Sequence, residues 1–262
     1  MLFKPGEVTK GDLSCEILRP MYKGGMAELY LGVLKNTGHK VVIKAAGGRE
    51  QSCRAIQKEA EILSMLRHQG IPEFQSFVKE ESRWYYIMAY YEGMTLEQYI
   101  GKYREMTEKQ VAEVVKNLCG IMVYLHDRDI IHNDIKPSNI LIQKSGGMIL
   151  LDYGLAGYTS EASDGWAFRG TLGYAAPECW QCCGRSPNSG PYTDIFALGA
   201  TMYYLLDRKE PGYSFGKYQL SEMDINKKNR WQPVLDRCTA RHPLDRYRSA
   251  AQVYEDISKW EL

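Results

Sequence analysis

Two short polar motifs near the middle of the chain carry the strongest chemical signal. The first covers residues 132–139 and reads HNDIKPSN, and the second, Asp152-Tyr153-Gly154, begins eighteen residues after Asp134. Either motif alone could be a loop of solvated polar residues. Their occurrence as a pair makes that alternative much weaker and favours a functional site.

The residues between the two motifs predict how the polar groups come together. Residues 140–142 and 148–151 are apolar, strand-like runs, and a hairpin there would bring Asp134, Asn139 and Asp152 to one edge. Two carboxylates and an amide oxygen are hard ligands that suit Mg²⁺ with bound phosphate. One of the carboxylates could instead accept a proton from a hydroxyl group.

The rest of the chain predicts elements of two kinds. The first ninety residues indicate strands and one main helix, and the pattern after Gly93 is helical. The predicted strands cover residues 28–34, 40–45, 74–78 and 84–91, with the helix at 55–66. Capping boxes begin at Thr95 and Thr107, residues 195–206 are an apolar run typical of a buried helix, and Ser249 is expected to cap the last helix. The prediction is an α+β fold with a small strand-rich lobe, a hinge near residues 90–93 and a larger helical lobe.

Composition excludes several classes of protein. The 262 residues carry 33 Lys and Arg against 32 Asp and Glu, for a net charge of +1, whereas a dedicated nucleic-acid binder would carry a basic excess. The apolar run at 195–206 is shorter than the roughly 20 residues that a membrane-spanning helix needs. The seven scattered cysteines suit free thiols in a reducing compartment, so we expect a cytoplasmic protein.

Taken together, the motifs resemble those of the eukaryotic-type (Hanks) serine/threonine protein kinase family, most closely its compact bacterial members. Besides the two polar motifs, the chain contains Val41-Val42-Ile43-Lys44 and Ala176-Pro177-Glu178, in the order and at spacings that the family uses. The resemblance covers nearly the whole chain. It implies a bilobal kinase fold, with residues 1–91 as the N-lobe and 92–262 as the C-lobe.

The resemblance implies a role for each catalytic residue. Asp134 would act as the catalytic base or orient the substrate hydroxyl, and Lys136 would contact the γ-phosphate. Lys44 would hold the α- and β-phosphates, with Glu59 as its partner on the helix. Asn139 and Asp152 would hold Mg²⁺.

It also implies a nucleotide site and an activation segment. The expected ATP-binding residues are Lys23, Gly24, Gly25, Val42, Lys44, Met88, Ala89, Tyr90, Tyr91 and Leu141. The expected activation-segment residues are Tyr153, Gly154, Thr171 and Glu178. Glu178 would pair with Arg246, Asp194 would brace the catalytic-loop backbone, and His132 would pack and form hydrogen bonds rather than act as a base.

Five positions depart from the family pattern. Val42 stands where the family usually has an Ala over the adenine. Tyr22 and Ala27 stand where the nucleotide loop usually has its first and third glycines, Tyr153 replaces a Phe, and Asn133 replaces the Arg that precedes the catalytic Asp. Side chains at the glycine positions restrict the backbone conformations open to the loop. A neutral Asn133 leaves no cation at that position for an activation-loop phosphate to neutralise.

The functional prediction is an ATP- and Mg²⁺-dependent kinase that phosphorylates Ser and Thr hydroxyls of protein substrates, with no nucleic-acid partner and no membrane span. One alternative is a pseudokinase or nucleotide-binding signalling module, which the altered glycine loop would favour. The other is a small-molecule kinase, which shares the two acidic motifs. Lys136 and the segment from Thr171 to Glu178 favour a protein substrate over a small molecule.

Overall fold

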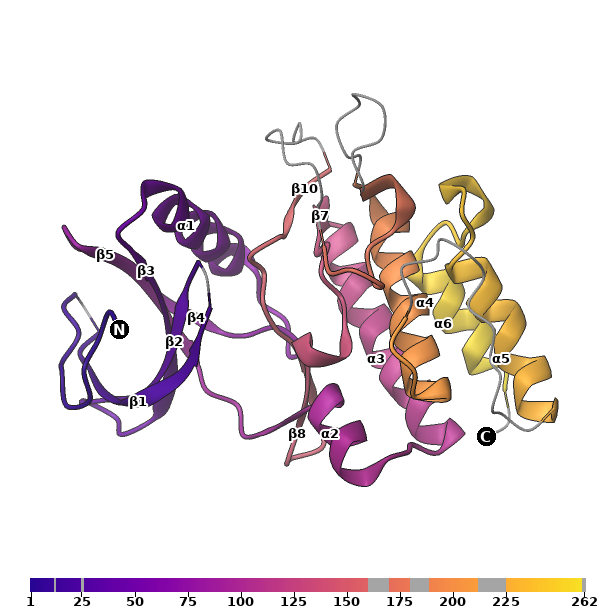
Figure 1. Cartoon of the computed structure of the whole chain (residues 1–262), viewed down its shortest axis with the longest axis horizontal. Helices are drawn as coiled ribbons and strands as arrows, with labels where there is room; N and C mark the ends of the chain where they lie inside the picture. The colour runs from indigo at the N-terminus through magenta and orange to yellow at the C-terminus, as the bar shows by residue number, and fades with distance from the viewer. Residues whose placement is uncertain (12, 25, 160–169, 180–188, 212–224, 261–262) are drawn as a thin grey trace. The chain divides into compact units, whose positions relative to one another are not determined.

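The computed structural model describes the chain except residues 12, 25, 160–169, 180–188, 212–224 and 261–262, and except the side chains of residues 225–228. The chain divides into two compact units, Met1–Glu92 and Gly93–Leu262. The first unit is a sheet with one α-helix, and the second is largely helical (Figure 1). The predicted α+β architecture, with its small strand-rich part and larger helical part, is confirmed.

The first unit is built on a five-stranded antiparallel sheet in the order β1-β2-β3-β5-β4. Its elements are β1 (Cys15–Lys23), β2 (Glu28–Leu34), β3 (Lys40–Gly47), α1 (Glu50–Met65), β4 (Phe74–Lys79) and β5 (Arg83–Ala89). The expected hairpin of 28–34 with 40–45 corresponds to β2 with β3, and the expected strands 74–78 and 84–91 correspond to β4 and β5, which also pair with each other.

Strand register sorts the side chains of this sheet onto two faces, because residues directly opposite each other on neighbouring strands share a face. Leu29 of β2 lies opposite Lys44 of β3, which lies opposite Tyr86 of β5. Tyr30 lies opposite Ile43, on the other face. The first face therefore carries Lys44, and the second belongs to an apolar core. That core contains Phe3, Cys15, Ile17, Tyr30, Leu34, Val41, Ile43, Ala45, Tyr85 and Ile87.

Helix α1 begins at Glu50, five residues before the predicted start at residue 55. The predicted apolar stripe of Ile56, Ala60 and Leu63 is buried. The first turn of the helix has no regularly spaced apolar residues, so periodicity did not predict it. Glu50 stabilises this turn because it lies near the positive end of the helix dipole and forms an ion pair with Arg54 at 2.6 Å.

The second unit contains helices with short strands between them. They are β6 (Gly93–Thr95), α2 (Leu96–Tyr103), α3 (Glu108–His126), β7 (Ile130–Ile131), η1 (Pro137–Asn139), β8 (Ile140–Gln143), β9 (Met148–Leu150), β10 (Gly157–Tyr158), η2 (Pro177–Cys179), α4 (Pro191–Asp207), α5 (Ile225–Cys238), η3 (Pro243–Asp245) and α6 (Ala250–Ser258). The expected hairpin between the two polar motifs is present, because β8 pairs antiparallel with β9.

Capping was predicted correctly at two helices and wrongly at a third. The Thr95 Oγ1 accepts a hydrogen bond from the Gln98 N–H at 3.2 Å, and the equivalent box forms at Thr107. At α6 the Ser249 side chain makes no capping bond. Instead, the Gln252 side-chain oxygen accepts the Arg248 N–H at 3.0 Å, so the glutamine satisfies a backbone donor ahead of the helix.

Helix α4 begins at Pro191, four residues before the predicted start at residue 195. The apolar run corresponds to the buried part of this helix. The helix begins earlier, at Pro191, because the fixed φ of proline suits the first position of a helix. Helix α5 was not predicted. It follows residues outside the described part of the chain, has only polar residues at 226–230 after its first residue, Ile225, and contains Pro233. No helix that the structure describes is long and apolar enough to cross a membrane.

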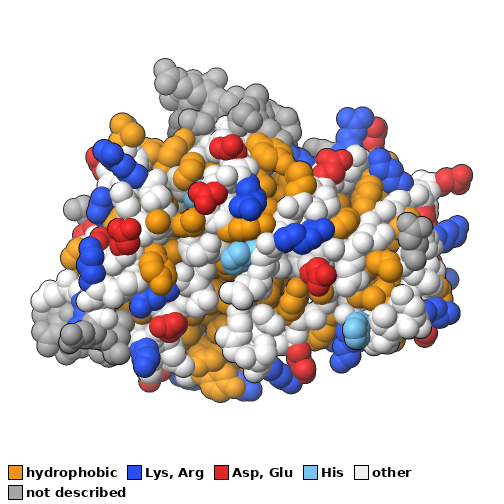
Figure 2. All heavy atoms as spheres, turned by 180° about the vertical axis from the view of Figure 1, so that it is seen from behind, with side chains coloured by type: hydrophobic (Ala, Val, Ile, Leu, Met, Phe, Trp, Pro, Cys, Tyr) orange, Lys and Arg blue, Asp and Glu red, His pale blue; other side chains and the backbone are white. Residues whose placement is uncertain are grey.

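Charged side chains of both signs are interspersed on the face shown in Figure 2. That mixture agrees with a net charge of +1 for the whole chain.

Candidate active site

The Asp134 carboxylate lies at the centre of a hydrogen-bonded cluster in the second unit. Its Oδ2 atom accepts hydrogen bonds from the Asn139 Nδ2 at 2.9 Å and lies 2.8 Å from the Lys136 Nζ. Its Oδ1 atom accepts a hydrogen bond from the Thr171 Oγ1 at 2.6 Å. Asp134 is 7% exposed, and the three donors satisfy a carboxylate that burial alone would destabilise.

The Asn139 amide is oriented by its nitrogen. Nδ2 donates both to the Asp134 carboxylate and to the Asp134 main-chain oxygen, each at 2.9 Å. The single turn η1 holds the residue in place, with the Asn139 N–H donating to the Lys136 oxygen at 3.0 Å. Because the nitrogen is committed to Asp134, the oxygen Oδ1 is the atom that can face a metal ion.

The β8–β9 hairpin returns the chain beside Asn139 and delivers Asp152 there. The Leu151 N–H donates to the main-chain oxygen of Asn139 at 2.7 Å. Asp152 is the next residue along the chain. Asp152 is exposed and has a φ of 60°, and its Oδ1 accepts the Gly154 N–H at 3.3 Å. An exposed carboxylate beside an oriented amide oxygen fits Mg²⁺, which takes one or two protein oxygens and fills its other positions with water and phosphate.

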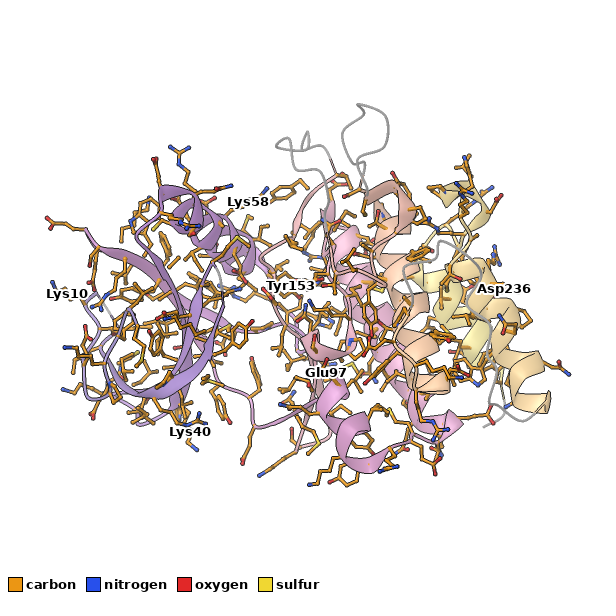
Figure 3. The ribbon with its side chains drawn as sticks, in the orientation of Figure 1. Lys10, Lys40, Lys58, Glu97, Tyr153 and Asp236 are labelled. Atoms are coloured by element: carbon orange, nitrogen blue, oxygen red, sulfur yellow. The ribbon has the colours of Figure 1, made fainter. Side chains whose placement is uncertain are left out.

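His132 and Tyr153 form the buried floor of this cluster. The His132 ring bonds to the Leu151 oxygen at 3.1 Å and accepts the Asp134 N–H at 3.3 Å, which fits a packing and hydrogen-bonding role. Its ring meets the ring of Tyr153, labelled in Figure 3, edge to face with centroids 4.8 Å apart. Burial raises the pKa of Tyr153 well above its usual value, so its phenol is neutral.

Asp194 of α4 holds the backbone just before Asp134 by hydrogen bonds. Its Oδ2 accepts the His132 N–H and its Oδ1 accepts the Asn133 N–H, both at 2.9 Å. The Asp194 side chain is fully buried, and it also bonds to the Nε2 of His126 at 2.9 Å. None of the sequence motifs includes His126. Its place in the last turn of α3, six residues before His132, is the one signal for this contact.

Asn133 links the segment just before Asp134 to the residues after Asp152. It is buried and has a φ of 65°, a region where asparagine is enriched among non-glycine residues. Its Nδ2 donates to the Leu155 oxygen at 3.0 Å and to the Ile131 oxygen at 3.4 Å. The sequence predicted that Asn133 is neutral, but it did not predict the contact of Asn133 with Leu155.

Glu178 pairs with Arg246 at the end of the expected activation segment. The two guanidinium nitrogens of Arg246 contact the two carboxylate oxygens at 2.6 and 2.8 Å. The Arg246 side chain is fully buried, and such a bidentate pair is geometrically specific. Nearby, Tyr174 donates to the Glu210 carboxylate at 3.1 Å, and burial raises the pKa of its phenol.

In the first unit, Lys44 and Glu59 form a second ionic pair. The Lys44 Nζ lies 2.7 Å from the Glu59 Oε1, and their side chains are 13% and 2% exposed. Glu59 lies on the buried side of α1, which puts this helix over the Lys44 face of the sheet. Val42 shares that face because it is two residues from Lys44 and lies opposite Met88.

The expected nucleotide loop connects β1 to β2, and Gly25 lies outside the described residues. The Gly24 N–H donates to the Ala27 oxygen at 2.9 Å, which closes a turn within the loop. A Cβ at Gly24 would come within 2.9 Å of the Tyr22 ring, so that ring lies against the glycine. Lys23 is largely exposed and lies 3.7 Å from the Glu28 carboxylate.

The expected adenine-binding residues end the sheet and begin the connection to the second unit. The Ala89 N–H donates to the Glu73 oxygen at 2.9 Å, and the Tyr90 N–H donates to the Lys40 oxygen at 3.3 Å. The Tyr91 hydroxyl accepts the Glu73 N–H at 3.1 Å, and burial raises the pKa of Tyr91.

Leu141 belongs to β8 of the second unit. Its expected contribution to one adenine site with Val42 therefore stays a prediction.

Comparison with known proteins identifies the family of this chain. A protein kinase domain model matches residues 16–257. The chain belongs to the protein kinase family. The match extends over both units, and the family's phosphoryl donor is ATP.

Among curated kinases, the chain is similar to bacterial and animal members. It is 28% identical over 260 residues to serine/threonine-protein kinase PrkC of Bacillus subtilis, covering 92% of this chain and 40% of that kinase. It is 31% identical over 196 residues to sperm motility kinase 1 of Mus musculus, covering 75% of this chain and 40% of the relative. The chain thus spans about two fifths of the length of these relatives.

Proposed function

We propose that this kinase domain is catalytically active and transfers the γ-phosphoryl group of ATP to Ser and Thr hydroxyls of protein substrates. One observation carries the proposal. The Thr171 hydroxyl donates to Asp134 at 2.6 Å and accepts from the Lys136 ammonium at 2.6 Å. A hydroxyl of the chain itself thus occupies the kind of position, between a carboxylate and a cation, that a substrate hydroxyl needs.

In this mechanism Asp134 orients the attacking hydroxyl and accepts its proton. The Asn139 hydrogen bond keeps the carboxylate in one orientation, and the Asp194 contacts hold the backbone on which Asp134 sits. Pre-set orientation of this kind lowers the barrier because no group has to move as charge develops. The Lys136 ammonium lies beside the same oxygen and would stabilise negative charge on the transferred phosphoryl group.

Two further sets of residues would hold the phosphates. Asn139 Oδ1 and the Asp152 carboxylate would hold Mg²⁺, which when bound neutralises charge on the phosphate oxygens. Lys44, fixed by Glu59, would contact the α- and β-phosphates. Val42, Met88, Ala89, Tyr90, Tyr91 and Leu141 would line the adenine site.

The acceptor class is argued from residues and from relatives. Lys136 and Thr171 meet at Asp134, and this pairing resembles the serine/threonine kinase pattern rather than a small-molecule kinase. Relatives named serine/threonine-protein kinase include PrkC of Bacillus subtilis and, as a probable one, PknB of Lactococcus lactis. Both observations favour hydroxyl groups of serine and threonine in proteins.

One observation favours a second candidate, a nucleotide-binding pseudokinase. The Gly24 N–H is already bonded to Ala27 within the loop, so at this position the loop has one fewer donor for phosphate. Lys44, Glu59, Asp134, Asn139 and Asp152 are all present, however, and a pseudokinase has no need to keep that whole set.

The test is mass spectrometry after incubation with MgATP and a generic protein substrate, comparing wild type with Asp134→Asn. Wild type should phosphorylate itself or the substrate on Ser and Thr, and the variant should do so at least ~10²-fold more slowly, the usual cost of removing a main catalytic group. Equal labelling by both proteins would place the reaction elsewhere. Labelling dominated by phosphotyrosine would overturn the acceptor assignment, and ATP binding without transfer would favour the pseudokinase.

A further inference from the structure

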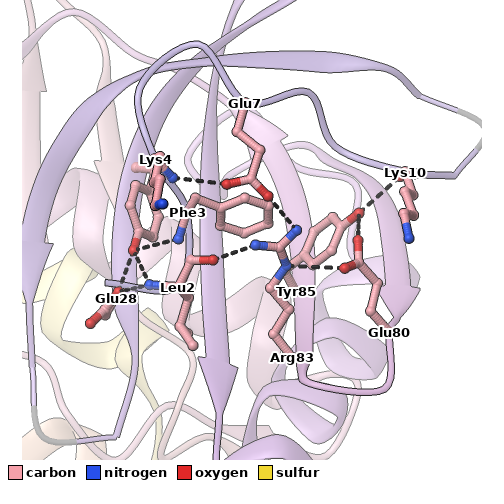
Figure 4. A network of polar contacts seen from close by, with 10 residues as sticks. Leu2, Phe3, Lys4, Glu7, Lys10, Glu28, Glu80, Arg83 and Tyr85 are labelled. Carbon is pink, nitrogen blue, oxygen red and sulfur yellow. Dashed lines mark hydrogen bonds and ion pairs between the residues drawn. The ribbon is translucent and has the colours of Figure 1, made fainter.

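The N-terminal residues Leu2–Lys10, here called the N-terminal strap, cover the face of the first sheet that lies opposite Lys44. Phe3 is fully buried in the core of that face (Figure 4). Its ring meets the rings of Tyr30 and Tyr85 edge to face, with centroids 5.4 and 5.2 Å apart. The strap is therefore part of the packed core, not a loose terminus.

Arg83 of β5 fastens the strap from outside. Its guanidinium carbon lies 3.7 Å from the centroid of the Phe3 ring, the stacked arrangement of a cation–π contact. The same group donates to the Leu2 oxygen, to the Glu7 carboxylate at 2.7 Å and to the Glu80 carboxylate at 3.1 Å. One partly buried arginine thus joins the strap at Leu2 and Glu7 to the turn between β4 and β5, which is far from the strap in the sequence.

At the other end of the network, Glu28 joins the strap to the nucleotide loop. Its Oε2 accepts the Leu2 N–H at 2.7 Å and the Tyr30 hydroxyl, and its Oε1 lies 3.7 Å from Lys23. Burial opposes ionisation of Glu28, but the hydrogen bonds from Tyr30 and Leu2 outweigh it and leave the pKa of this carboxyl lowered. Glu28 is therefore anionic at neutral pH.

The position of Glu28 gives these contacts a consequence for the loop. Glu28 is the first residue of β2, directly after the loop, and it lies opposite Lys23, the last residue of β1. Its other cross-strand partner is Ala45, so its side chain is on the face away from Lys44 and reaches the strap rather than a nucleotide. The strap also contacts β1, because the Ile17 N–H donates to the main-chain oxygen of Glu7 at 2.8 Å.

We propose that the strap clamps the β1–β2 hairpin and that Glu28 is a positioning residue for ATP, holding the nucleotide loop from the far side of the sheet. The inference rests on the proposed function, because it requires that this loop binds ATP. The loop has Tyr22 and Ala27 at two positions where the family usually has glycine. The Gly24 N–H is bonded to the Ala27 oxygen within the loop. A loop that offers fewer phosphate contacts depends more on being held in one conformation, since ordering it on binding would reduce affinity.

The experiment compares Glu28→Gln with Glu80→Gln, two neutral isosteres at opposite ends of the same network. Glu28→Gln should raise KM for ATP about tenfold, the effect of losing a hydrogen bond to a charged group, with kcat within about twofold of wild type. Glu80→Gln should leave KM for ATP within about twofold, because Arg83 keeps its contacts with Leu2 and Glu7. An unchanged KM in Glu28→Gln, or equal changes in both variants, would overturn the proposal.

Phe3→Ala provides a second route, because it loosens the strap without touching Glu28. It should also raise KM for ATP, and the double variant Phe3→Ala/Glu28→Gln should be no worse than the more severe single one, since both act through the same contact. Additive effects would mean that the strap and Glu28 act separately, against the proposal. Calorimetric titration of each protein with MgATP separates this result from the proposed function. Wild type that binds ATP without transferring phosphate would refute the activity but leave the Glu28 comparison decisive, whereas wild type that binds no ATP would overturn both.

Discussion

At the scale of single residues, the candidate site depends on carboxylates that differ in burial. Asp134 and Asp194 are buried, and each is surrounded by donors from several segments. Asp152 is exposed, and its Oδ1 accepts a hydrogen bond from the backbone N–H of Gly154. The first two are thus tied to the fold through buried contacts, whereas the Asp152 carboxylate lies at the surface, where water and a metal ion can reach it.

Replacing Asp152 by Asn should abolish most of the activity while leaving the fold intact. The variant keeps an amide oxygen but loses the negative charge that attracts Mg²⁺, and we expect kcat to fall ~10²-fold or more. Asparagine is the better choice than alanine because φ is 60° at this position, where asparagine is tolerated. Steady-state kinetics and thermal melting would check this. A variant that kept more than about a third of wild-type turnover would contradict the metal-ligand role.

Residues inside motifs were predictable, and residues that act on those motifs from outside were not. The Lys44–Glu59 and Glu178–Arg246 contacts were expected from a resemblance that identifies each partner. The contacts of His126 with Asp194 and of Asn133 with Leu155 depend on how α3, α4 and the catalytic loop pack. No local pattern encodes such tertiary distances, so sequence reasoning missed them.

At the scale of elements, the nucleotide loop is the part that departs most from its family. Tyr22 lies opposite Leu29, which lies opposite Lys44, so the Tyr22 side chain is on the Lys44 face of the sheet. Its ring lies against Gly24, where a phosphate would need close access to the backbone. We therefore expect this loop to bind ATP more weakly than a loop with three glycines.

Restoring glycine at Tyr22 and Ala27 should therefore lower KM for ATP. The double variant removes the ring from the Lys44 face and frees the backbone to adopt conformations closed to other residues, and kcat should change little. Initial rates at a series of ATP concentrations would measure both constants. A higher KM in the double variant would mean instead that the Tyr22 ring itself contacts the nucleotide, and Tyr22→Phe would show whether its hydroxyl is needed.

Element boundaries show where periodicity stops being informative. The apolar stripes of α1 and α4 were recognised, but both helices begin earlier than their first apolar residues, with a charged turn in one and a proline in the other. β1 was not singled out because its six residues after Ile17 are exposed. It forms by pairing with β2 and by contact with the N-terminal strap, which are properties of the assembled sheet.

At the scale of the whole molecule, regulation is expected to depend on Asn133, a neutral residue where many protein kinases have an Arg. In relatives with an Arg before the catalytic Asp, an activation-loop phosphate neutralises that cation and orders the loop. Here Asn133 is buried and bonds through its amide to Leu155 and Ile131. The link between the segment around Asp134 and the residues after Asp152 is therefore made by a neutral amide, without a charge that needs a phosphate.

Activity should accordingly be independent of phosphorylation of this loop. The candidate acceptors are Thr159, whose N–H donates to the Asp129 oxygen at 2.9 Å, and Ser160 and Ser163, which with Arg169 lie outside the described residues. Phosphatase-treated wild type and a Thr159/Ser160/Ser163 triple-Ala variant should match untreated wild type in kcat/KM, with Thr171 kept in both because it contacts Asp134. A loss of ~10-fold or more in both proteins, about 1.4 kcal/mol in the barrier, would mean that another cation receives an activating phosphate. A loss in the triple variant alone would point to the side chains rather than to phosphate.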